Sequence, residues 1–362
     1  MGILATGMIA PNVEAYLGNL GRLLVDEIQL DLVLDRPASG RLAERYGCQI
    51  YPLRMPTRGL RRLESFRALL HYTLRARPDI LTHAIDFETL GMVATLVGRL
   101  VGVPTITRYA GQVLDAYRFE PTFARRLKIS VLANVLGQVP LHCSDRILTL
   151  GPALAAEIER HGGRRDRVTI VPQPVDRSLF RPVADRSVLR AQLGLPQQSR
   201  LVLFAGRLEY LKGADVLHWL IPRVLARRNN VCFCLIGAGE WLEPLRASPA
   251  ARSGALLLPG VLPHDQVALY MQAADLFVYP SRTDGLPTVL LEAVACGVPV
   301  ISRAIGDARQ VTSHLFQHED ELLQYLLRPD WPAEELPAQF DDAALACRYR
   351  RLFQLTAKGR RR

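Results

Sequence analysis

Short apolar runs alternate with helix-period segments along most of the chain. An apolar run of four to eight residues between turn residues is typical of a strand buried on both faces, and the amphipathic segments between such runs predict covering helices. The first series of predicted strands is 2–8, 29–35, 79–84, 103–108, 146–150 and 167–171, with helices over 12–26, 60–76 and 86–101. The second series is 200–205, 231–236, 254–258, 275–279 and 298–302. This order predicts an α/β fold with two doubly wound, Rossmann-like layers in tandem.

The segment 171–198 between the two series is rich in proline and polar turn residues, which is typical of a domain boundary. We expect a first Rossmann-like domain over 1–175, a linker over 176–198 and a second Rossmann-like domain over 199–335. A helix and a basic tail over 336–362 can cross back to the first domain. Ligands of open α/β sheets bind at the carboxyl ends of the strands, so two such domains facing each other across a cleft would gather the chemistry there.

Composition narrows the class of protein. The 362 residues carry 45 Lys and Arg against 35 Asp and Glu, for a net charge of +10, and 49% are hydrophobic, which is not the composition of a disordered protein. The six cysteines lack zinc spacing, which predicts reduced thiols in a cytoplasmic protein. The start lacks the basic region of a secretory signal, and no apolar stretch is long enough to span a bilayer.

The first motif with chemical meaning follows the predicted strand 200–205. Gly206 permits a tight turn, and Arg207 and Lys212 place two cations in the loop that leads to the next helix. A guanidinium fork and an ammonium can together neutralise a diphosphate. The alternative interpretation is a pair of solvated surface cations on an ordinary turn.

The second motif is PSRTDGLPTVLLEAVACGVPVI, residues 280–301. Pro287 suits the first position of a helix whose free amides would face an anion. Asp284 lies just before this helix and Glu292 eight residues later, so one carboxylate is near the loop and the other deeper along the helix. Paired acids also occur in hydrolases, but two cations beside them favour sugar and ribose hydroxyls as their partners. The alternative is a helix N-cap at Asp284 and a solvated Glu292.

The span 199–313 resembles the donor-binding half of family 4 glycosyltransferases (group 1), which are retaining enzymes of the two-domain GT-B fold. The resemblance rests on GRLEYLKG, the GAGE turn, LPHDQVALYMQAADLFVYPS and DGLPTVLLEAVACGVPVI, in this order. It implies that Arg207 and Lys212 hold the donor diphosphate and stabilise the departing nucleotide. Glu292 matches the second Glu of the family's E-x7-E motif, which binds the ribose. Asp284 stands in place of the first Glu, at the sugar, with a side chain one carbon shorter.

The same resemblance assigns further donor-binding positions. The turn from Gly237 through Gly239 and Glu240 would lie near the base. The sugar and phosphate side would be lined by Gly285, Leu286, Pro287 and Thr288, and Gly206 would turn the chain toward the donor.

The first half matches this family less closely. Pro11 and Asn12 stand in place of the family's flexible glycines, while Glu14 is retained. The family's frequent His after the strand 103–108 is absent, and Tyr109 occupies its place. We assign Asn12, Glu14, His83 and Tyr109 to the acceptor side. A structural role is the alternative for His83.

The resemblance therefore implies a hexosyltransferase that moves a hexose-like sugar from a nucleotide-diphosphate sugar to a glycan or lipid-linked acceptor, with retention, in bacterial cell-surface polysaccharide or glycolipid synthesis. No two Asp residues stand two positions apart, so metal-clamped donor binding is unsupported, and we expect neither a metal nor a cofactor. The alternatives are a catalytically silent GT-B partner subunit that binds a nucleotide sugar, and a nucleotide-sugar hydrolase or epimerase.

The basic residues of the first half suggest a second partner. Arg54, Arg58, Arg61, Arg62, Arg67, Arg75 and Arg77 lie close together in the chain, and Arg125, Arg126 and Lys128 precede the apolar stretch 129–143. Cations beside apolar residues suit an anionic membrane surface, so we expect a cytoplasmic protein that can attach peripherally to the inner face of the plasma membrane. A solvated basic face is the alternative, and the absence of a recognised module argues against nucleic acid.

Overall fold

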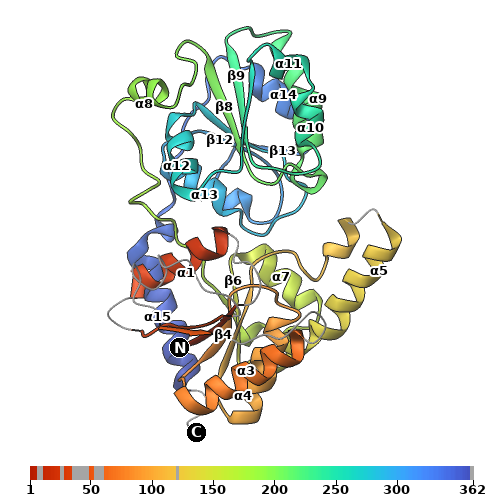
Figure 1. Ribbon diagram of the computed structural model, residues 1–362, viewed down its shortest axis with the longest axis vertical. Coiled ribbons are helices and arrows are strands. Elements are labelled where there is room, and N and C mark those ends of the chain that lie inside the picture. The colour runs from red at the N-terminus through yellow and green to blue at the C-terminus, as the bar shows by residue number, and fades with distance from the viewer. Residues whose placement is uncertain (6–10, 25–27, 35–48, 53–60, 120–121, 359–362) are drawn as a thin grey trace. The chain divides into compact units, whose positions relative to one another are not determined.

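The computed structural model describes residues 1–5, 11–24, 28–34, 49–52, 61–119 and 122–358. Within these ranges the chain forms two compact units (Figure 1). The first comprises Met1–Pro174 together with Gln339–Arg362, and the second comprises Val175–Ala338. Each unit is built around its own parallel sheet.

The sheet of the first unit has seven described strands in the order β3-β2-β1-β4-β5-β6-β7. They are β1 Gly2–Ala5, β2 Asp31–Leu34, β3 Gln49–Pro52, β4 Leu81–His83, β5 Thr105–Tyr109, β6 Arg146–Thr149 and β7 Val168–Ile170. All six strands predicted for this half are present in its described residues. The edge strand β3 was not predicted, because its four residues mix polar, apolar and proline positions without a period.

Most helices of this unit pack apolar residues against the sheet. The described helices are α1 Pro11–Leu24, α3 Arg61–Ala76, α4 Leu90–Val101, α5 Phe123–Val131, a π-helical turn Leu132–Leu136, α6 Gln138–Cys143, α7 Pro152–Arg160 and α15 Asp342–Lys358. Short 3₁₀ turns occupy Ala116–Phe119, Arg165–Arg167 and Ala338–Phe340.

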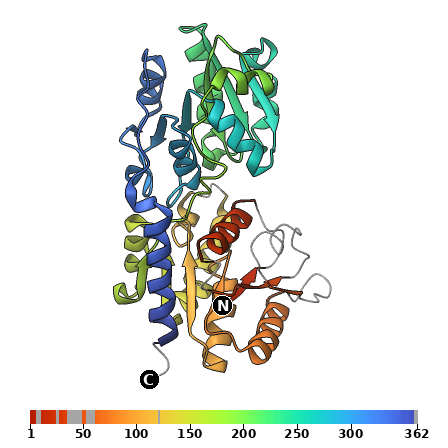
Figure 2. The same cartoon turned by 90° about the vertical axis from the view of Figure 1, so that its left-hand side faces the viewer.

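The last helix, α15, joins the core of the first unit although it lies at the other end of the sequence. Its buried residues Leu345 and Tyr349 share a cluster with Tyr16 and Leu20 of α1. The guanidinium of Arg22 on α1 pairs with Asp342 at 2.5 Å. Figure 2 shows α15, in blue, running along this unit.

The sheet of the second unit has six described strands in the Rossmann order β10-β9-β8-β11-β12-β13. They are β8 Arg200–Ala205, β9 Val231–Ile236, β10 Leu256–Gly260, β11 Leu276–Tyr279, β12 Val300–Arg303 and β13 Leu315–Phe316. The five predicted strands are confirmed, and the two-residue edge strand β13 was not predicted. The described helices are α8 Arg186–Gln192, α9 Ala214–Leu225, α10 Leu242–Arg246, α11 Pro249–Arg252, α12 His264–Ala273, α13 Thr288–Ala295 and α14 Glu319–Leu327, with 3₁₀ turns at Tyr210–Lys212 and Ala308–Gln310.

Residues 176–198, for which the sequence predicts a linker, pack on the second unit. This segment contains α8, and the Arg190 guanidinium donates to the carbonyl of Ala273 and pairs with Asp275 at 2.6 Å. The Leu179 carbonyl accepts a hydrogen bond from the Gln272 amide. Polar contacts to backbone and carboxylate therefore attach this segment to α12 and to the residue that precedes β11.

The thiols of Cys143, Cys232, Cys234, Cys296 and Cys347 are free, and Cys48 lies outside the described residues. Among the helices that the structure describes, none is long and apolar enough to cross a membrane.

Candidate active site

Arg207, Lys212 and Asp284 lie where the strand order of the second sheet reverses, between β8 and β11. Loops 206–213 and 280–287 leave the carboxyl ends of these neighbouring strands, the usual position of ligands in open α/β sheets. The two loops are joined directly, since the amide of Arg282 donates to the carbonyl of Leu211 at 2.9 Å. The parallel pairing of β8 with β11 therefore brings together two motifs about seventy residues apart in sequence.

Lys212, Asp284 and Tyr279 form one half-buried cluster at this point. The ammonium of Lys212 lies 2.7 Å from Oδ2 of Asp284 and 3.3 Å from the hydroxyl of Tyr279. The Tyr279 hydroxyl also donates to Oδ2 of Asp284 at 2.5 Å. Burial, followed by the charge of Asp284, raises the pKa of Tyr279 well above its ordinary value, so the phenol stays a proton donor. Oδ1 of Asp284 accepts a local hydrogen bond from the amide of Gly285 at 2.9 Å.

Arg207 differs from Lys212 in its exposure. Its side chain is 65% exposed and pairs with Glu209 at 2.7 Å. Surface ion pairs of this kind stabilise weakly, so the guanidinium can exchange Glu209 for a ligand anion at small cost. One cation of the predicted pair is thus held in place and the other is accessible.

Arg282 braces the loop after β11 against the loop after β8. Its guanidinium makes two hydrogen bonds of 2.6 Å to the carboxylate of Asp215 and lies 3.9 Å from the centre of the Tyr210 ring. A planar fork on a carboxylate fixes both distance and orientation. This contact holds the position of the cluster around Lys212.

The turn after β9 packs against the turn after β8. Gly237 has φ +139°, and a Cβ placed there would lie 1.9 Å from the carbonyl oxygen of Gly206. Glycine is therefore required by this close approach. The next residues are held too: Ala238 accepts a hydrogen bond from the amide of Leu208, and Glu240 accepts one from the amide of Tyr210 at 3.2 Å. Gly239 lies between them, against the carbonyl of Leu208.

Glu292 lies on α13, which begins at Thr288 with Pro287 as its N-cap. The prediction that Pro287 takes the first helical position is therefore wrong by one residue, and Asp284 does not serve as the cap. Leu286 and Pro287 are buried, while Thr288 is half-buried. Glu292 is not solvated: Oε1 lies 2.9 Å from Nε2 of His264, the first residue of α12.

Four contact residues of this site were not singled out from the sequence: Glu209, His264, Tyr279 and Arg282. Each lies within a motif already quoted, but its role depends on a partner from another loop. The sequence carries one signal that could have identified such residues, which is a polar side chain inside or beside an apolar run, such as Tyr279 at the end of β11.

His83 lies inside the first unit. Its side chain is 1% exposed, Nδ1 lies 3.0 Å from the carbonyl of Ile85, and Nε2 accepts from the amide of Arg108 at 3.0 Å. Burial lowers the pKa of His83 to about 4, so the ring is neutral. With both nitrogens bonded to backbone atoms, the ring has no nitrogen available for a substrate, which supports the structural interpretation of this residue.

Tyr109 is also fully buried, and its hydroxyl donates to Glu157 at 2.7 Å. Glu14 is half-buried in the first turn of α1, and the side chain of Asn12 lies outside the described residues. A polar group that the sequence did not indicate is Arg108, whose guanidinium lies 4.0 Å from the ring centre of Tyr16 and donates to Gln173 at 2.8 Å.

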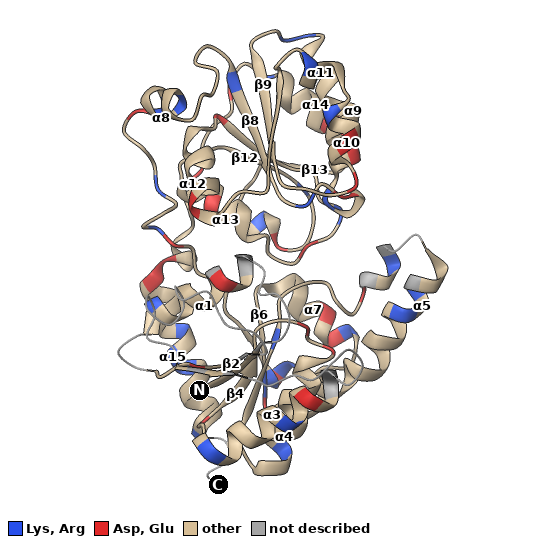
Figure 3. Cartoon of the chain, viewed as in Figure 1, with Lys and Arg blue, Asp and Glu red and all other residues tan. Residues whose placement is uncertain are grey.

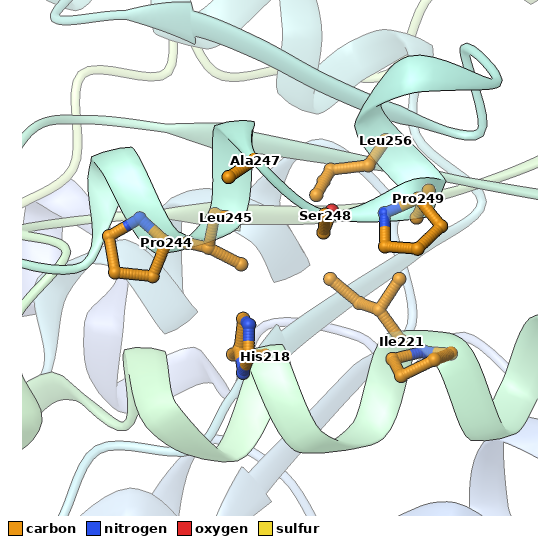
Figure 4. Close-up of a pocket in the computed structure, with 10 residues that line it drawn as sticks. His218, Ile221, Pro244, Leu245, Ala247, Ser248, Pro249 and Leu256 are labelled. Carbon is orange, nitrogen blue, oxygen red and sulfur yellow. The ribbon is translucent and has the colours of Figure 1, made fainter.

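A separate cavity of about 360 Å³ lies on the outer side of the second unit, between α9 and the α10–α11 segment (Figure 4). Its lining is mostly apolar and includes Ile221, Leu245 and Leu256, with His218 at one end. It contains none of the predicted donor residues. Among the described residues, no cluster of three or more His, Cys, Asp or Glu side chains is arranged to hold a metal ion.

Comparison with known families identifies both halves of the chain. The family described as "Glycosyl transferases group 1" matches residues 185–322, and the family described as "Glycosyl transferase 4-like domain" matches residues 13–174. The chain belongs to the group 1, family 4-like glycosyltransferases. The first match covers the loops after β8 and β11 and the helix α13.

Individual relatives agree with this family. The chain is 32% identical over 242 residues to D-inositol 3-phosphate glycosyltransferase 1 of Catenulispora acidiphila, covering 60% of this chain and 54% of the relative. The matched region spans about half the length of the curated relatives.

Solved structures share the fold. HepE of Anabaena in complex with UDP-glucose superposes with a TM-score of 0.72 at 18% identity, covering 99% of this chain and 95% of that one. Sucrose-phosphate synthase of Thermosynechococcus elongatus gives 0.69 at 20% identity, covering 98% and 94%. The fold of this group 1 glycosyltransferase is therefore GT-B.

Proposed function

We propose that this chain is a hexosyltransferase that moves a hexose-like sugar from a nucleotide-diphosphate sugar to a glycan or lipid-linked acceptor, with retention at C1. The observation that carries the proposal is the convergence of Lys212, Asp284 and Tyr279 at the switch point of the second sheet, beside the accessible Arg207. Two cations and a carboxylate at this edge suit a sugar diphosphate better than they suit an uncharged ligand.

In this proposal the two cations have different roles. Lys212 is already positioned by Asp284 and neutralises the diphosphate without moving, which is the preorganisation that stabilises developing charge. Arg207 leaves Glu209 and forks onto the phosphate oxygens. Asp284 lies at the sugar and Glu292 at the ribose hydroxyls. No metal and no cofactor takes part.

The test is acceptor-dependent release of the free nucleotide diphosphate. UDP-glucose is the first donor to try, because HepE of the same fold binds it. D-inositol 3-phosphate is the first soluble acceptor, because the relatives are named for it. We expect release only when donor and acceptor are both present. Thermal stabilisation by a donor without release under any acceptor would instead support the silent partner subunit.

Retention and metal independence have their own readouts. The anomeric configuration of the product, read by NMR, should match that of the donor. Release should be undiminished in excess chelator. An absolute requirement for a divalent metal contradicts the electrostatic role given to Arg207 and Lys212.

We further propose that the enzyme works in the cytoplasm at the inner face of the plasma membrane, in cell-surface polysaccharide or glycolipid synthesis. Free thiols among the described cysteines suit a reducing compartment. The exposed cations Arg67, Arg75 and Arg77, on and just after α3, suit an anionic surface. The side chains of Arg54, Arg58, Arg61 and Arg62 lie outside the described part of the chain.

A further inference from the structure

Helix α5 of the first unit carries a row of exposed apolar side chains. Phe123 is 77% exposed, Leu127 56%, Val131 50% and Val135 60%. They follow one another at every fourth position, the first three on α5 and the last on the π-helical turn 132–136 that continues it. Exposed apolar residues are common singly, but a row of four along one element indicates a contact surface.

The backbone keeps these side chains on one face. In an α-helix each fourth residue advances by about 40°, so Phe123, Leu127 and Val131 span roughly 80°. The hydrogen bond from the amide of Gly137 to the carbonyl of Leu132, five residues back, marks a wider turn at this point. This wider turn limits the drift of Val135, so the four side chains form a continuous stripe.

Cations border the stripe on both sides. By helical geometry Arg126 lies about 60° from Phe123 on one side, and Lys128 lies about 60° beyond Val131 on the other. No acidic residue occurs between 123 and 143. Figure 3 shows the Lys and Arg positions along α5. The element is therefore amphipathic and uniformly basic.

Apart from the adjoining 3₁₀ turn Ala116–Phe119, which contacts α5, the helix is attached to its unit through the segment that follows it. Ala133, Pro140 and Leu141 are buried, and α6 packs against α4, whereas every side chain described from 122 to 128 is exposed. Figure 1 shows α5 reaching outward from the rest of the first unit. Nothing in the described part of the unit covers the stripe.

We propose that the surface formed by Phe123, Leu127, Val131 and Val135, with Arg126 and Lys128 at its borders, docks on an anionic phospholipid bilayer. The apolar side chains enter the boundary between headgroups and acyl chains, and the cations meet lipid phosphates. A second copy of the chain is a poorer occupant, because the bordering cations of two copies would face each other. This proposal rests on the proposed function, because it identifies the element by which the enzyme contacts the membrane. Binding of the surface to a membrane can be tested without any glycosyl transfer.

The test is binding of the full chain to vesicles of phosphatidylcholine with or without phosphatidylglycerol, measured by flotation. We expect binding only when phosphatidylglycerol is present, weakened by salt. Leu127→Asp and Val131→Asp should each reduce the affinity at least tenfold, because an apolar contact is lost and a repelled charge is added. Lys128→Glu should reduce it about fivefold or more.

Two exposed residues of the second unit provide matched controls. Val261→Asp introduces the same charge at a site that is 70% exposed, and Arg252→Glu inverts an exposed cation on α11. Both controls should bind like the unaltered chain. All variants should keep the same thermal midpoint, because the altered side chains are exposed.

Membrane binding and glycosyl transfer have separate readouts, so the failure of one proposal can be distinguished from the failure of the other. Nucleotide release with a soluble acceptor and no vesicles should be unchanged in Leu127→Asp. Vesicle binding without transfer activity would contradict the proposed function and would still support the membrane-binding surface. Three results would overturn the surface proposal. They are binding by Leu127→Asp and Val131→Asp that is as tight as that of the unaltered chain, binding of the unaltered chain to neutral vesicles that is as tight as to anionic ones, or dimerisation that these variants abolish.

Discussion

The imidazole Nε2 of His264 lies 2.9 Å from Oε1 of Glu292, across two helices of the second unit. The two residues are 28 positions apart, and the ring of Phe180, 4.9 Å away between centroids, packs on His264. The carboxylate that the family resemblance assigns to the ribose is thus oriented by a histidine from α12.

We expect this pair to make stability depend on pH. Burial lowers the pKa of His264, but the hydrogen bond and charge of Glu292, with Asp176 and Asp265, outweigh burial and raise it above the ordinary 6.5. A raised pKa in the folded state means that the contribution is complete below that ordinary value and is lost as pH rises through the folded pKa. The unaltered chain should therefore have a higher free energy of unfolding than His264→Gln. We expect this difference to be about 1 kcal/mol larger at mildly acidic pH than at mildly alkaline pH.

Denaturant unfolding of both chains across this pH range measures the difference. His218→Gln is the matched control, since this imidazole contacts Trp241 and no carboxylate pairs with it among the described contacts. A stability difference between His264→Gln and the unaltered chain that does not change with pH would contradict a charged His264–Glu292 pair.

Removal of either donor cation should abolish most of the transfer. Arg207→Ala and Lys212→Ala each delete a cation that the proposed function places on the departing diphosphate, so we expect the rate of acceptor-dependent nucleotide release to fall by about a hundredfold or more. Arg223→Ala removes an exposed cation of α9 that contacts Trp219 and should leave the rate unchanged. Unchanged turnover in both donor-site variants would refute the assignment.

Tyr279 and Asp284 should be energetically coupled. The phenol donates to Asp284 at 2.5 Å, so Tyr279→Phe leaves the carboxylate with Lys212 and its local amide. We expect a loss of about 1 to 3 kcal/mol in the free energy of unfolding and a reduced rate of release. In Asp284→Glu the side chain is one carbon longer, so we expect its carboxylate to lose the hydrogen bond from Tyr279. The effect of Asp284→Glu should therefore be smaller in a chain that already carries Tyr279→Phe.

A double-mutant cycle of Tyr279→Phe and Asp284→Glu, read in both unfolding and nucleotide release, measures this coupling. Effects that add without an interaction energy would mean that Tyr279 does not hold Asp284. Tyr270→Phe, on α12, is the matched control for loss of a phenol hydroxyl.

Gly213 should tolerate no side chain. Its φ is +76°, and a Cβ would lie 2.3 Å from the carbonyl oxygen of Pro280. Gly213→Ala therefore combines left-handed backbone strain with a backbone clash, and we expect a loss of about 3 kcal/mol. Gly254 has nearly the same φ, +77°, with open space around it, so Gly254→Ala should lose only about 1 kcal/mol. Equal unfolding free energies for the two variants would show that the loops after β8 and β11 are not in contact.

The interior strands of both sheets were predictable, and the outer ones less so. β8 and β9 are continuous apolar runs because they are buried on both faces. β3 and β13 each pair on one side only, at a sheet edge. β3 mixes polar and apolar residues and β13 has only two residues, so neither forms an apolar run long enough to predict a strand. Periodicity therefore reveals the centre of a parallel sheet better than its borders.

The sequence by itself determined the two-sheet α/β organisation and the motifs around Arg207, Lys212, Asp284 and Glu292, because burial periods and turn residues are local signals. Only the tertiary structure decided their partners. It pairs Lys212 with Asp284, 72 positions away in the sequence, and it pairs Glu292 with His264. It also buries His83, whose ring nitrogens contact backbone groups. The physical reason is that side-chain partners depend on which loops a parallel sheet brings to the same edge, and that neighbourhood is set by strand order rather than by spacing along the chain.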